Sequence, residues 1–336
     1  MPSRLPEAPS RLRKDERATA AIDITVLGTC VADILVKPVP LATSVGAGRL
    51  FHVDPIEVTT GGIVCNTGIG LTRLGFRVAA AGLVGADSWG ELIRARLAAA
   101  GLDIEAIETT SRAATSTTAV LIDAAGERSF AHHVGACAAI DLEYVQRRLA
   151  GIARGSWVVL GYAGLLPGLE PDLRAAIGLI HATGCRVAVE TGGTGGRLAD
   201  VAAALPQIDL YVPSLAEAAA QTGCDEPREI IAHYRAFGAA GIVGVKAGAA
   251  GTLLSPAVGD FTPIPCLPPP GPVADTTGAG DAFLAGLVAG LVRGMPLEEA
   301  GLLGAANAAC CVTGVGATAG LRCFAETCAV AGLKVC

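Results

Sequence analysis

The chain has few lysines, few aromatic residues and no lysine-containing phosphate loop, and each shortage excludes a class of protein. Only four of the 336 residues are lysine, and none of them follows a glycine. A Gly-Lys-Ser/Thr P-loop is therefore absent, which excludes the ATPases that hold phosphate with that motif. Aromatic residues make up 4% of the chain, the net charge is −6, and no basic patch with interleaved aromatics occurs. These features argue against a nucleic-acid partner.

Long apolar runs are also missing, although hydrophobic residues make up 51% of the chain. The clearest unbroken run of small apolar residues, 282–292, is shorter than the roughly 20 residues that span a bilayer. We therefore expect no membrane span, and a parallel sheet covered by helices on both faces instead. Residues 1–20 contain five basic residues and no apolar core, which favours a disordered tail over a secretory signal.

Recognisable metal spacings are absent as well. The eleven cysteines include no Cys-x-x-Cys pair, and the five histidines include no His-Glu-x-x-His pattern. Cys30, Cys65, Cys185 and Cys310 lie in runs of apolar or small residues, where free thiols behave as small hydrophobic side chains. We expect reduced thiols, a cytoplasmic protein and no zinc site.

Strand-like and helix-like segments alternate along most of the chain. The main strand candidates are 22–27, 78–84, 157–160, 186–190, 210–212 and 242–245. Helical stretches lie between them, so the pattern predicts βαβ units and a parallel sheet of the α/β class. Segment 34–59 lacks helical periodicity, and segment 113–135 contains a predicted hairpin. In such sheets active sites lie at the carboxyl ends of the strands.

The run D-T-T-G-A-G-D-A-F at 275–283 is the most informative motif. Gly278, Ala279 and Gly280 directly precede Asp281 and an apolar, helix-like run. If a helix starts here, its N–H groups and its dipole favour a bound anion. Asp281 beside such a site could take a proton from a substrate hydroxyl, and the two together are the minimum machinery for phosphoryl transfer to an alcohol. The alternative is a glycine-rich turn capped by an aspartate.

A second glycine-rich motif lies at 61–75. The paired Gly61 and Gly62 allow close approach of the backbone to a ligand. Asn66, at the predicted start of a helix, can donate and accept hydrogen bonds with a diol. Taken alone, this motif favours a structural turn followed by a helix N-cap over a ligand site.

Together the two motifs resemble the signatures of the PfkB, or ribokinase-like, family of carbohydrate and nucleoside kinases, over about residues 22–320. The resemblance implies a three-layer α/β/α fold with a mostly parallel central sheet and a small β-sheet lid from about 34–59 and 113–135. A kinase domain at 21–325 would then be followed by a C-terminal tail at 326–336. The resemblance also implies ATP, Mg²⁺ and often K⁺. A homodimer through the lid is expected because exposed strand edges invite pairing.

The resemblance also implies roles for individual residues, by their positions in the family motifs. Asp281 is the implied catalytic base, and Gly278, Ala279 and Gly280 form the implied anion hole. Substrate hydroxyls would be bound by Asp33, Gly61, Gly62 and Asn66. Nucleotide contacts would come from Ser214, Lys246, Gly248, Gly251, Thr276 and Asn307. Glu217 would hold Mg²⁺ through water, and Asp275 with the Thr277 backbone would hold the monovalent cation. Without the resemblance, the sequence would favour a solvated turn residue at Asp33, and Asp275 would be explained as an ordinary turn cap.

Several positions depart from the family pattern or stay open. Ser214 stands where the family commonly has the asparagine of Asn-x-x-Glu. Ile63 follows the paired glycines where ribokinase itself has a lysine, which weakens a ribose-specific interpretation. Glu190 ends a predicted strand where many members have aspartate. His132 and His133, in the expected lid, contact either the substrate and its incoming phosphate or only the lid and solvent.

Three functions fit these motifs. The first is ATP-dependent phosphorylation of a hydroxymethyl group of a small sugar. The second is a nucleoside kinase, because Asp33 and Asn66 suit a ribose diol equally well, although the scarcity of aromatics argues against a stacked base. The third is a catalytically silent sugar- or nucleotide-binding sensor. The intact Asp281 argues against a sensor, and Ser214 leaves it open.

Overall fold

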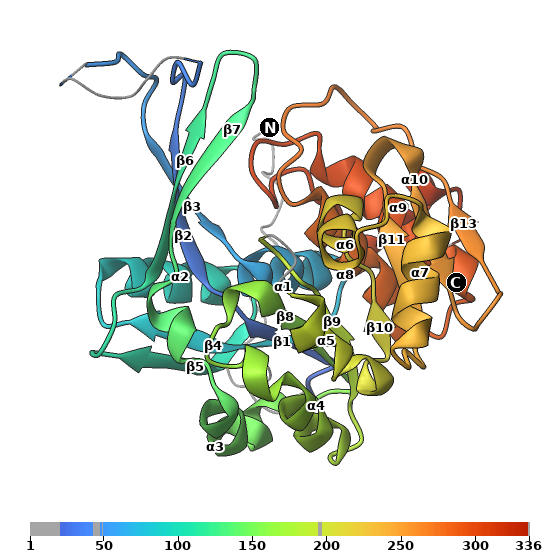
Figure 1. Ribbon diagram of the computed structural model, residues 1–336. Coiled ribbons are helices and arrows are strands. Elements are labelled where there is room, and N and C mark those ends of the chain that lie inside the picture. Colours follow the sequence, from blue (N-terminus) through green and yellow to red (C-terminus); the bar gives the residue numbers. More distant parts are fainter. Residues whose placement is uncertain (1–20, 43–47, 49, 194–196, 335–336) are drawn as a thin grey trace, which may run out of the picture.

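A computed structural model of the chain describes residues 21–42, 48, 50–193 and 197–334 (Figure 1). The expected N-terminal tail, 1–20, lies outside the described residues. Within the described part of the chain, no helix combines the length and the apolar character that crossing a membrane requires.

The body of the protein is built on one large sheet, sheet A. Its strands are β1 (Ile24–Gly28), β4 (Val78–Gly85), β5 (Asp103–Thr110), β8 (Trp157–Gly161), β9 (Arg186–Val189), β10 (Leu210–Tyr211), β11 (Ile242–Lys246), β12 (Thr252–Ser255) and β13 (Thr262–Ile264). The order across the sheet is β13-β12-β11-β10-β9-β8-β1-β4-β5, and only β12 and β13 run antiparallel to their neighbours. The parallel sheet expected from the alternating pattern is confirmed.

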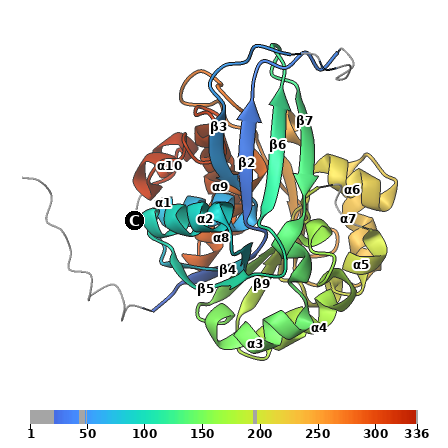
Figure 2. The same ribbon diagram turned by 90° about the vertical axis from the view of Figure 1, so that its left-hand side faces the viewer.

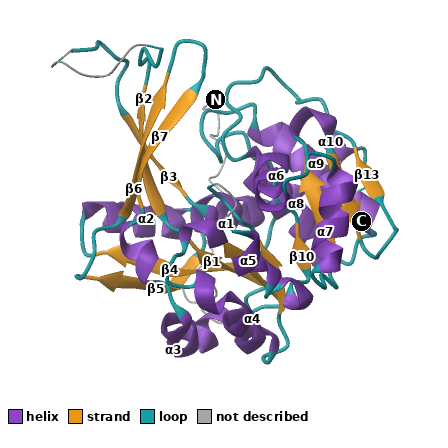
Figure 3. Ribbon diagram, in the orientation of Figure 1, coloured by secondary structure: helices purple, strands orange, loops and turns teal. Residues whose placement is uncertain are grey.

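Helices cover sheet A on both faces, as Figure 3 shows. One layer contains α1 (Ile63–Arg73), α2 (Ser88–Ala99), α8 (Ala279–Val292), α9 (Leu297–Cys311) and α10 (Phe324–Ala331); the other contains α3 (Leu142–Ile152), α4 (Leu173–His181), α5 (Leu198–Ala202), α6 (Leu215–Thr222) and α7 (Pro227–Ala236). Along β8, Trp157 and Val159 pack in the core on the first side, and Val158 and Leu160 in the core on the second. Both sides of the strand are apolar because both are covered. The three-layer fold is therefore confirmed.

A second, smaller sheet forms the expected lid. Sheet B has the order β3 (Glu57–Gly61), β2 (Val31–Val36), β6 (Ser116–Ile122) and β7 (Arg128–His133). It stands away from the helical layers at one end of the body (Figures 1 and 2). The predicted hairpin is the antiparallel pair β6 and β7. The strand expected after 34 begins earlier, at Val31, so the first lid strand follows β1 almost directly.

The C-terminal boundary differs from the expected one. A tail was expected from residue 326, but α10 continues to Ala331 and packs against α9. Cys328 is fully buried and Leu333 packs against the same core. These apolar contacts make residues 326–333 part of the packed body.

Candidate functional site

A cavity of about 1050 Å³ lies between sheet B and the carboxyl-end edge of sheet A. Four polar residues that line it follow strands of sheet A directly or closely: Tyr162 after β8, Glu190 after β9, Ser214 after β10, and Lys246 at the end of β11. Carboxyl ends of parallel strands meet at one edge of a sheet. The fold therefore gathers these side chains although they are far apart in sequence.

The first turn of α8 forms another wall of the cavity. Gly278 is the N-cap, with φ of +75°, and a Cβ at this position would lie 2.4 Å from the Cβ of Ala317. Only glycine fits both the left-handed backbone and the close approach. The helix begins at Ala279, three residues before the predicted apolar run, so Gly280 and Asp281 lie in its first turn. The N–H groups of that turn and the helix dipole favour an anion here.

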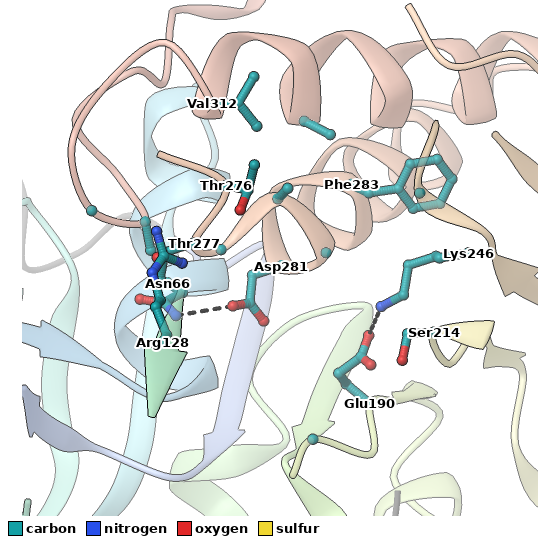
Figure 4. A pocket seen from close by; sticks show the side chains of 18 of the residues that line it. Asn66, Arg128, Glu190, Ser214, Lys246, Thr276, Thr277, Asp281, Phe283 and Val312 are labelled. Atoms are coloured by element: carbon teal, nitrogen blue, oxygen red, sulfur yellow. Dashed lines mark hydrogen bonds and ion pairs between the residues drawn. The ribbon is translucent and has the colours of Figure 1, made fainter. Parts of the chain in front are cut away.

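Asp281 is buried and held by two donors, of which Figure 4 shows Asn66. Its Oδ2 accepts hydrogen bonds from the Asn66 amide at 2.9 Å and from the Tyr162 hydroxyl at 2.6 Å. Burial raises the pKa of Asp281, and the two hydrogen bonds oppose that shift. Burial also raises the pKa of Tyr162, so its hydroxyl stays protonated and donates. Because both donors reach Oδ2, Oδ1 is the oxygen left to accept a proton.

Lys246 and Glu190 form a buried ion pair at 2.7 Å, with side chains 11% and 5% exposed. Burial raises the pKa of Glu190 to about 7, and Lys246 opposes that shift. Burial disfavours the charged form of Lys246, but the carboxylates of Glu190, Glu217 and Asp281 outweigh it and raise the pKa of the lysine. The ammonium lies 3.5 Å from the position that a Cβ of Gly280 would take. A fixed positive charge thus stands beside the first turn of α8.

The lid supplies a polar row on the opposite side. Asp33 on β2 lies in register with Thr59 on β3 and Thr118 on β6, and Thr118 with His132 on β7. All four line the cavity. The hydroxyl of Thr118 is hydrogen-bonded to Nδ1 of His132 at 2.9 Å. Burial raises the pKa of Asp33 to about 6, and the Thr118 hydrogen bond opposes the shift.

The paired glycines make room for this polar row. A Cβ on Gly61 would lie 2.0 Å from Oδ2 of Asp33, so Gly61 leaves space for the carboxylate rather than lining the cavity. Gly62 lines the cavity with φ of +79° and lies against the carbonyl of Thr29. Both glycines are therefore required by close contacts at the start of α1.

The model of the pfkB family carbohydrate kinases matches residues 22–322. The chain belongs to the PfkB family. Among curated relatives, it is 33% identical over 271 residues to a 1-phosphofructokinase from Rhodobacter capsulatus, covering 77% of this chain and 82% of the relative. It is 31% identical to a fructokinase from Klebsiella pneumoniae, covering 83% and 88%. The chain is accordingly a sugar kinase that transfers phosphate to an alcohol.

Solved structures agree on the fold. The structure of Arabidopsis thaliana ribokinase complexed with ribose and ATP superimposes with a TM-score of 0.80 at 22% identity, covering 94% of this chain and all of that one. A putative ribokinase II from E. coli, in complex with ATP and Mg²⁺, gives a TM-score of 0.76 at 20% identity, covering 92% and 98%. At these identities the likeness establishes the ribokinase-like fold alone.

The departure at Ser214 from the PfkB pattern has a local structural role. Ser214 is the N-cap of α6 and forms a capping box with Glu217. Its N–H and hydroxyl donate to Oε2 of Glu217 at 2.8 and 2.6 Å, and the Glu217 N–H donates back to its Oγ at 3.3 Å. Ser214 therefore fixes the orientation of the carboxylate of Glu217, the residue of the family pattern that this chain retains.

The implied nucleotide contacts divide into two groups. The cavity is lined by Ser214, Lys246, Gly248, Gly251 and Thr276. Asn307 is not among the lining residues. It is fully buried on α9 and donates to the carbonyl of Ala282 at 2.7 Å, so it joins α9 to α8 and does not face the cavity. Ala305, Ala308 and Ala309 face it instead.

Two further residues of this PfkB kinase were missed or left open by the sequence. Tyr162 belongs to no motif; its only signal is that it directly follows the strand at 157–161, at the edge where sites form. Both lid histidines are exposed; His132 lines the cavity, whereas His133, which pairs with Thr117 in the strand register, is not among the lining residues. Burial, together with His133, lowers the pKa of His132, so it favours the neutral form.

Proposed function

We propose that this PfkB kinase transfers the γ-phosphoryl group of ATP to a hydroxymethyl group of a small sugar. The observation that carries the proposal is the position of Asp281 in the first turn of α8, in the same cavity as Asp33 of the lid. The site thus combines a base, an anion-binding helix end and an acid that accepts hydroxyl protons in hydrogen bonds. Relatives named fructokinase and 1-phosphofructokinase support a sugar as the acceptor.

In this mechanism the acceptor alcohol lies between Asp281 and the γ-phosphate. Asp281 accepts the hydroxyl proton as the oxygen attacks the γ-phosphorus, and the bond from that phosphorus to the bridging oxygen breaks and releases ADP. The N–H groups of residues 278–280 and the helix dipole stabilise the charge on the transferred group. Lys246 adds a positive charge at the same end of the helix and holds its position through Glu190. The sugar hydroxyls are bound by Asp33 and Asn66.

The carboxylates around Lys246 have the donor chemistry that Mg²⁺ prefers. The described residues contain no group of three or more His, Cys, Asp and Glu side chains that could hold a metal by themselves. Mg²⁺ commonly binds one or two carboxylates together with substrate phosphates and waters, so the site fits an ion that arrives with ATP. Glu217, oriented by Ser214, would hold it through water. When bound, Mg²⁺ neutralises charge on the phosphates.

One observation favours a second candidate, a nucleoside kinase. Next to the polar row of the lid lies an apolar row across three strands, formed by Leu35, Val120 and Phe130. With a sugar bound, these side chains would exclude water from the reaction. With a nucleoside bound, they would cover the base while Asp33 and Asn66 bind the ribose. Product formation over a panel of sugars, sugar phosphates and nucleosides separates the two candidates.

The proposal extends to assembly and location. β3 and β7 are the two edge strands of sheet B, and edge strands invite pairing with another chain. We therefore propose a homodimer through the lid; a light-scattering mass of a single chain, 33.6 kDa, would contradict it.

Ten cysteines of the described residues are free, and free thiols of this number are typical of the reducing cytoplasm.

The test of the function is Asp281→Asn, which keeps the shape of the side chain and removes the base. We expect kcat to fall by about 10²- to 10⁴-fold, the usual contribution of a general base, with little change in the Kd of ATP. Asp260→Asn, at an exposed position, is the matched control and should keep full activity. Near-normal turnover of the Asp281→Asn variant on its best sugar would refute the assignment.

A further inference from the structure

The carboxylate of Asp275, implied by the family resemblance as a ligand of a monovalent cation, is already bonded on both oxygens. Oδ1 accepts the N–H of Thr277 at 2.8 Å and its hydroxyl at 2.7 Å, and Oδ2 accepts the N–H of Gly316 at 2.8 Å. The guanidinium of Arg128 also donates to Oδ1 and forms an ion pair with the carboxylate.

The second implied ligand, the backbone carbonyl of Thr277, also has a donor within the chain. The thiol of Cys311 donates to this carbonyl at 3.4 Å and to that of Ala317 at 3.2 Å. A bound cation would have to displace these donors and lie against the positive charge of Arg128. The residues present therefore do not fit a bound K⁺.

Arg128 comes from a distant part of the fold. It is the first residue of β7 in the lid, and 147 positions separate it from Asp275 in the loop before α8. Figure 4 shows its side chain near Thr277, which donates to the same carboxylate oxygen of Asp275. The side chains of Arg128 and Asp275 are 20% and 5% exposed, so the pair is largely shielded from solvent. Arginine keeps its charge at all physiological pH values.

We propose that Arg128 supplies, from the lid, the positive charge that a monovalent cation would otherwise supply at Asp275. The inference rests on the proposed function, since it concerns the loop that leads to the anion-binding end of α8. It has two consequences. Phosphoryl transfer requires no K⁺, and the Asp275 carboxylate, which accepts two hydrogen bonds from Thr277, has its full set of contacts only when the lid is closed, because Arg128 moves with sheet B.

The test compares the wild type, Arg128→Gln, Arg128→Lys and Arg112→Gln in KCl and in N-methylglucamine chloride of equal ionic strength. Arg112 is an exposed arginine between β5 and β6, and its replacement controls for loss of one positive charge. We expect kcat/KM of the wild type, Arg128→Lys and the control to be the same in both salts. The kcat/KM of Arg128→Gln in N-methylglucamine chloride should fall about tenfold below that of the wild type, as expected for the loss of a hydrogen bond to a charged group. KCl should raise the kcat/KM of Arg128→Gln about fivefold or more, which is the size of a typical coupling between sites.

Thermal unfolding in the same salts provides a second measurement that needs no turnover. KCl should raise the unfolding midpoint of Arg128→Gln relative to N-methylglucamine and leave that of the wild type unchanged. Stimulation or stabilisation of the wild type by K⁺ would overturn the inference, and this result is available even if Arg128→Gln does not fold. A folded Arg128→Gln that responds to K⁺ no more than the wild type would overturn it as well. Absence of any phosphorylated product from the wild type contradicts the proposed function instead, and the unfolding midpoints still decide the inference.

Discussion

Replacing Tyr162 by phenylalanine should change the acidity of the proposed base while leaving its surroundings nearly unchanged. The hydroxyl of Tyr162 donates to Oδ2 of Asp281 at 2.6 Å, and Asn66 donates to the same oxygen. Tyr162→Phe removes one of these two donors and keeps the ring. The carboxylate form of Asp281 loses stabilisation, whereas its protonated form does not.

The size of the effect follows from the energy of one hydrogen bond. A hydrogen bond to a charged group contributes about 1.5–3 kcal/mol. At about 1.4 kcal/mol per pKa unit, its loss raises the pKa of Asp281 by about one to two units. Because the base must be ionised to accept a proton, the acid limb of the kcat/KM profile should move to higher pH by that amount. The plateau at high pH should fall much less.

The measurement is kcat/KM for phosphoryl transfer as a function of pH, across the acid limb of the profile and its plateau. Tyr144→Phe is a matched control, because Tyr144 is only 1% exposed and its hydroxyl donates to the carbonyls of Gly82 and Ala106 and not to Asp281. The control should keep the wild-type profile. An unmoved acid limb in folded Tyr162→Phe, or an equal shift in both variants, would show that Tyr162 does not act on the base.

Two further predictions follow from buried charges. Lys246→Met leaves the carboxylate of Glu190 buried without its partner and should lower the free energy of unfolding in urea by about 3–5 kcal/mol. Adding Glu190→Gln should recover most of that loss. If the double variant is no more stable than Lys246→Met, the unpaired Glu190 carboxylate is not the cause of the destabilisation. For Asp33 the folded-state pKa of about 6 lies above the unfolded value. The contribution of this carboxyl group to the free energy of unfolding is therefore favourable below about pH 4 and is lost as the pH rises through 6. As the pH rises from about 4 to 7, Asp33→Asn should therefore gain stability relative to the wild type. A difference in the free energy of unfolding between variant and wild type that stays constant over this range would contradict the raised pKa.

The sequence predicts the layers of this fold well because each depends on local patterning. β1 and β8 are short apolar runs that end in glycine, and the strands that they pair with are similar runs. In the sequence, helical character is clear only in the apolar run at 282–292, whereas α8 begins three residues earlier, at Ala279. Its true start depends on Gly278, whose left-handed backbone is required by contact with Ala317 from another segment.

The motif residues of the site were predictable, but two of their partners, Tyr162 and Arg128, were not. Asn307 illustrates the limit of carrying a role over by position. Residues 305, 308, 309 and 312 line the cavity with the spacing of one helix face, and Asn307 lies off that face. Helical periodicity would have corrected the assignment once one lining residue was known. Tyr162 and Arg128 carry no such signal, because their contacts join segments more than a hundred residues apart.

A movement of the lid would affect the contacts within the body and those between lid and body differently. Asn66, Tyr162 and Asp281 all belong to α1, β8 and α8 or their ends, which are parts of the body, and so do Glu190 and Lys246. An opening of sheet B as a unit would leave the base and the ammonium in place. Of the ion pairs described at the site, the one between Arg128 and Asp275 joins the lid to the body. Under the proposed function, the base would therefore keep its donors whether the lid is open or closed, whereas the contact of Arg128 with Asp275 would depend on closure.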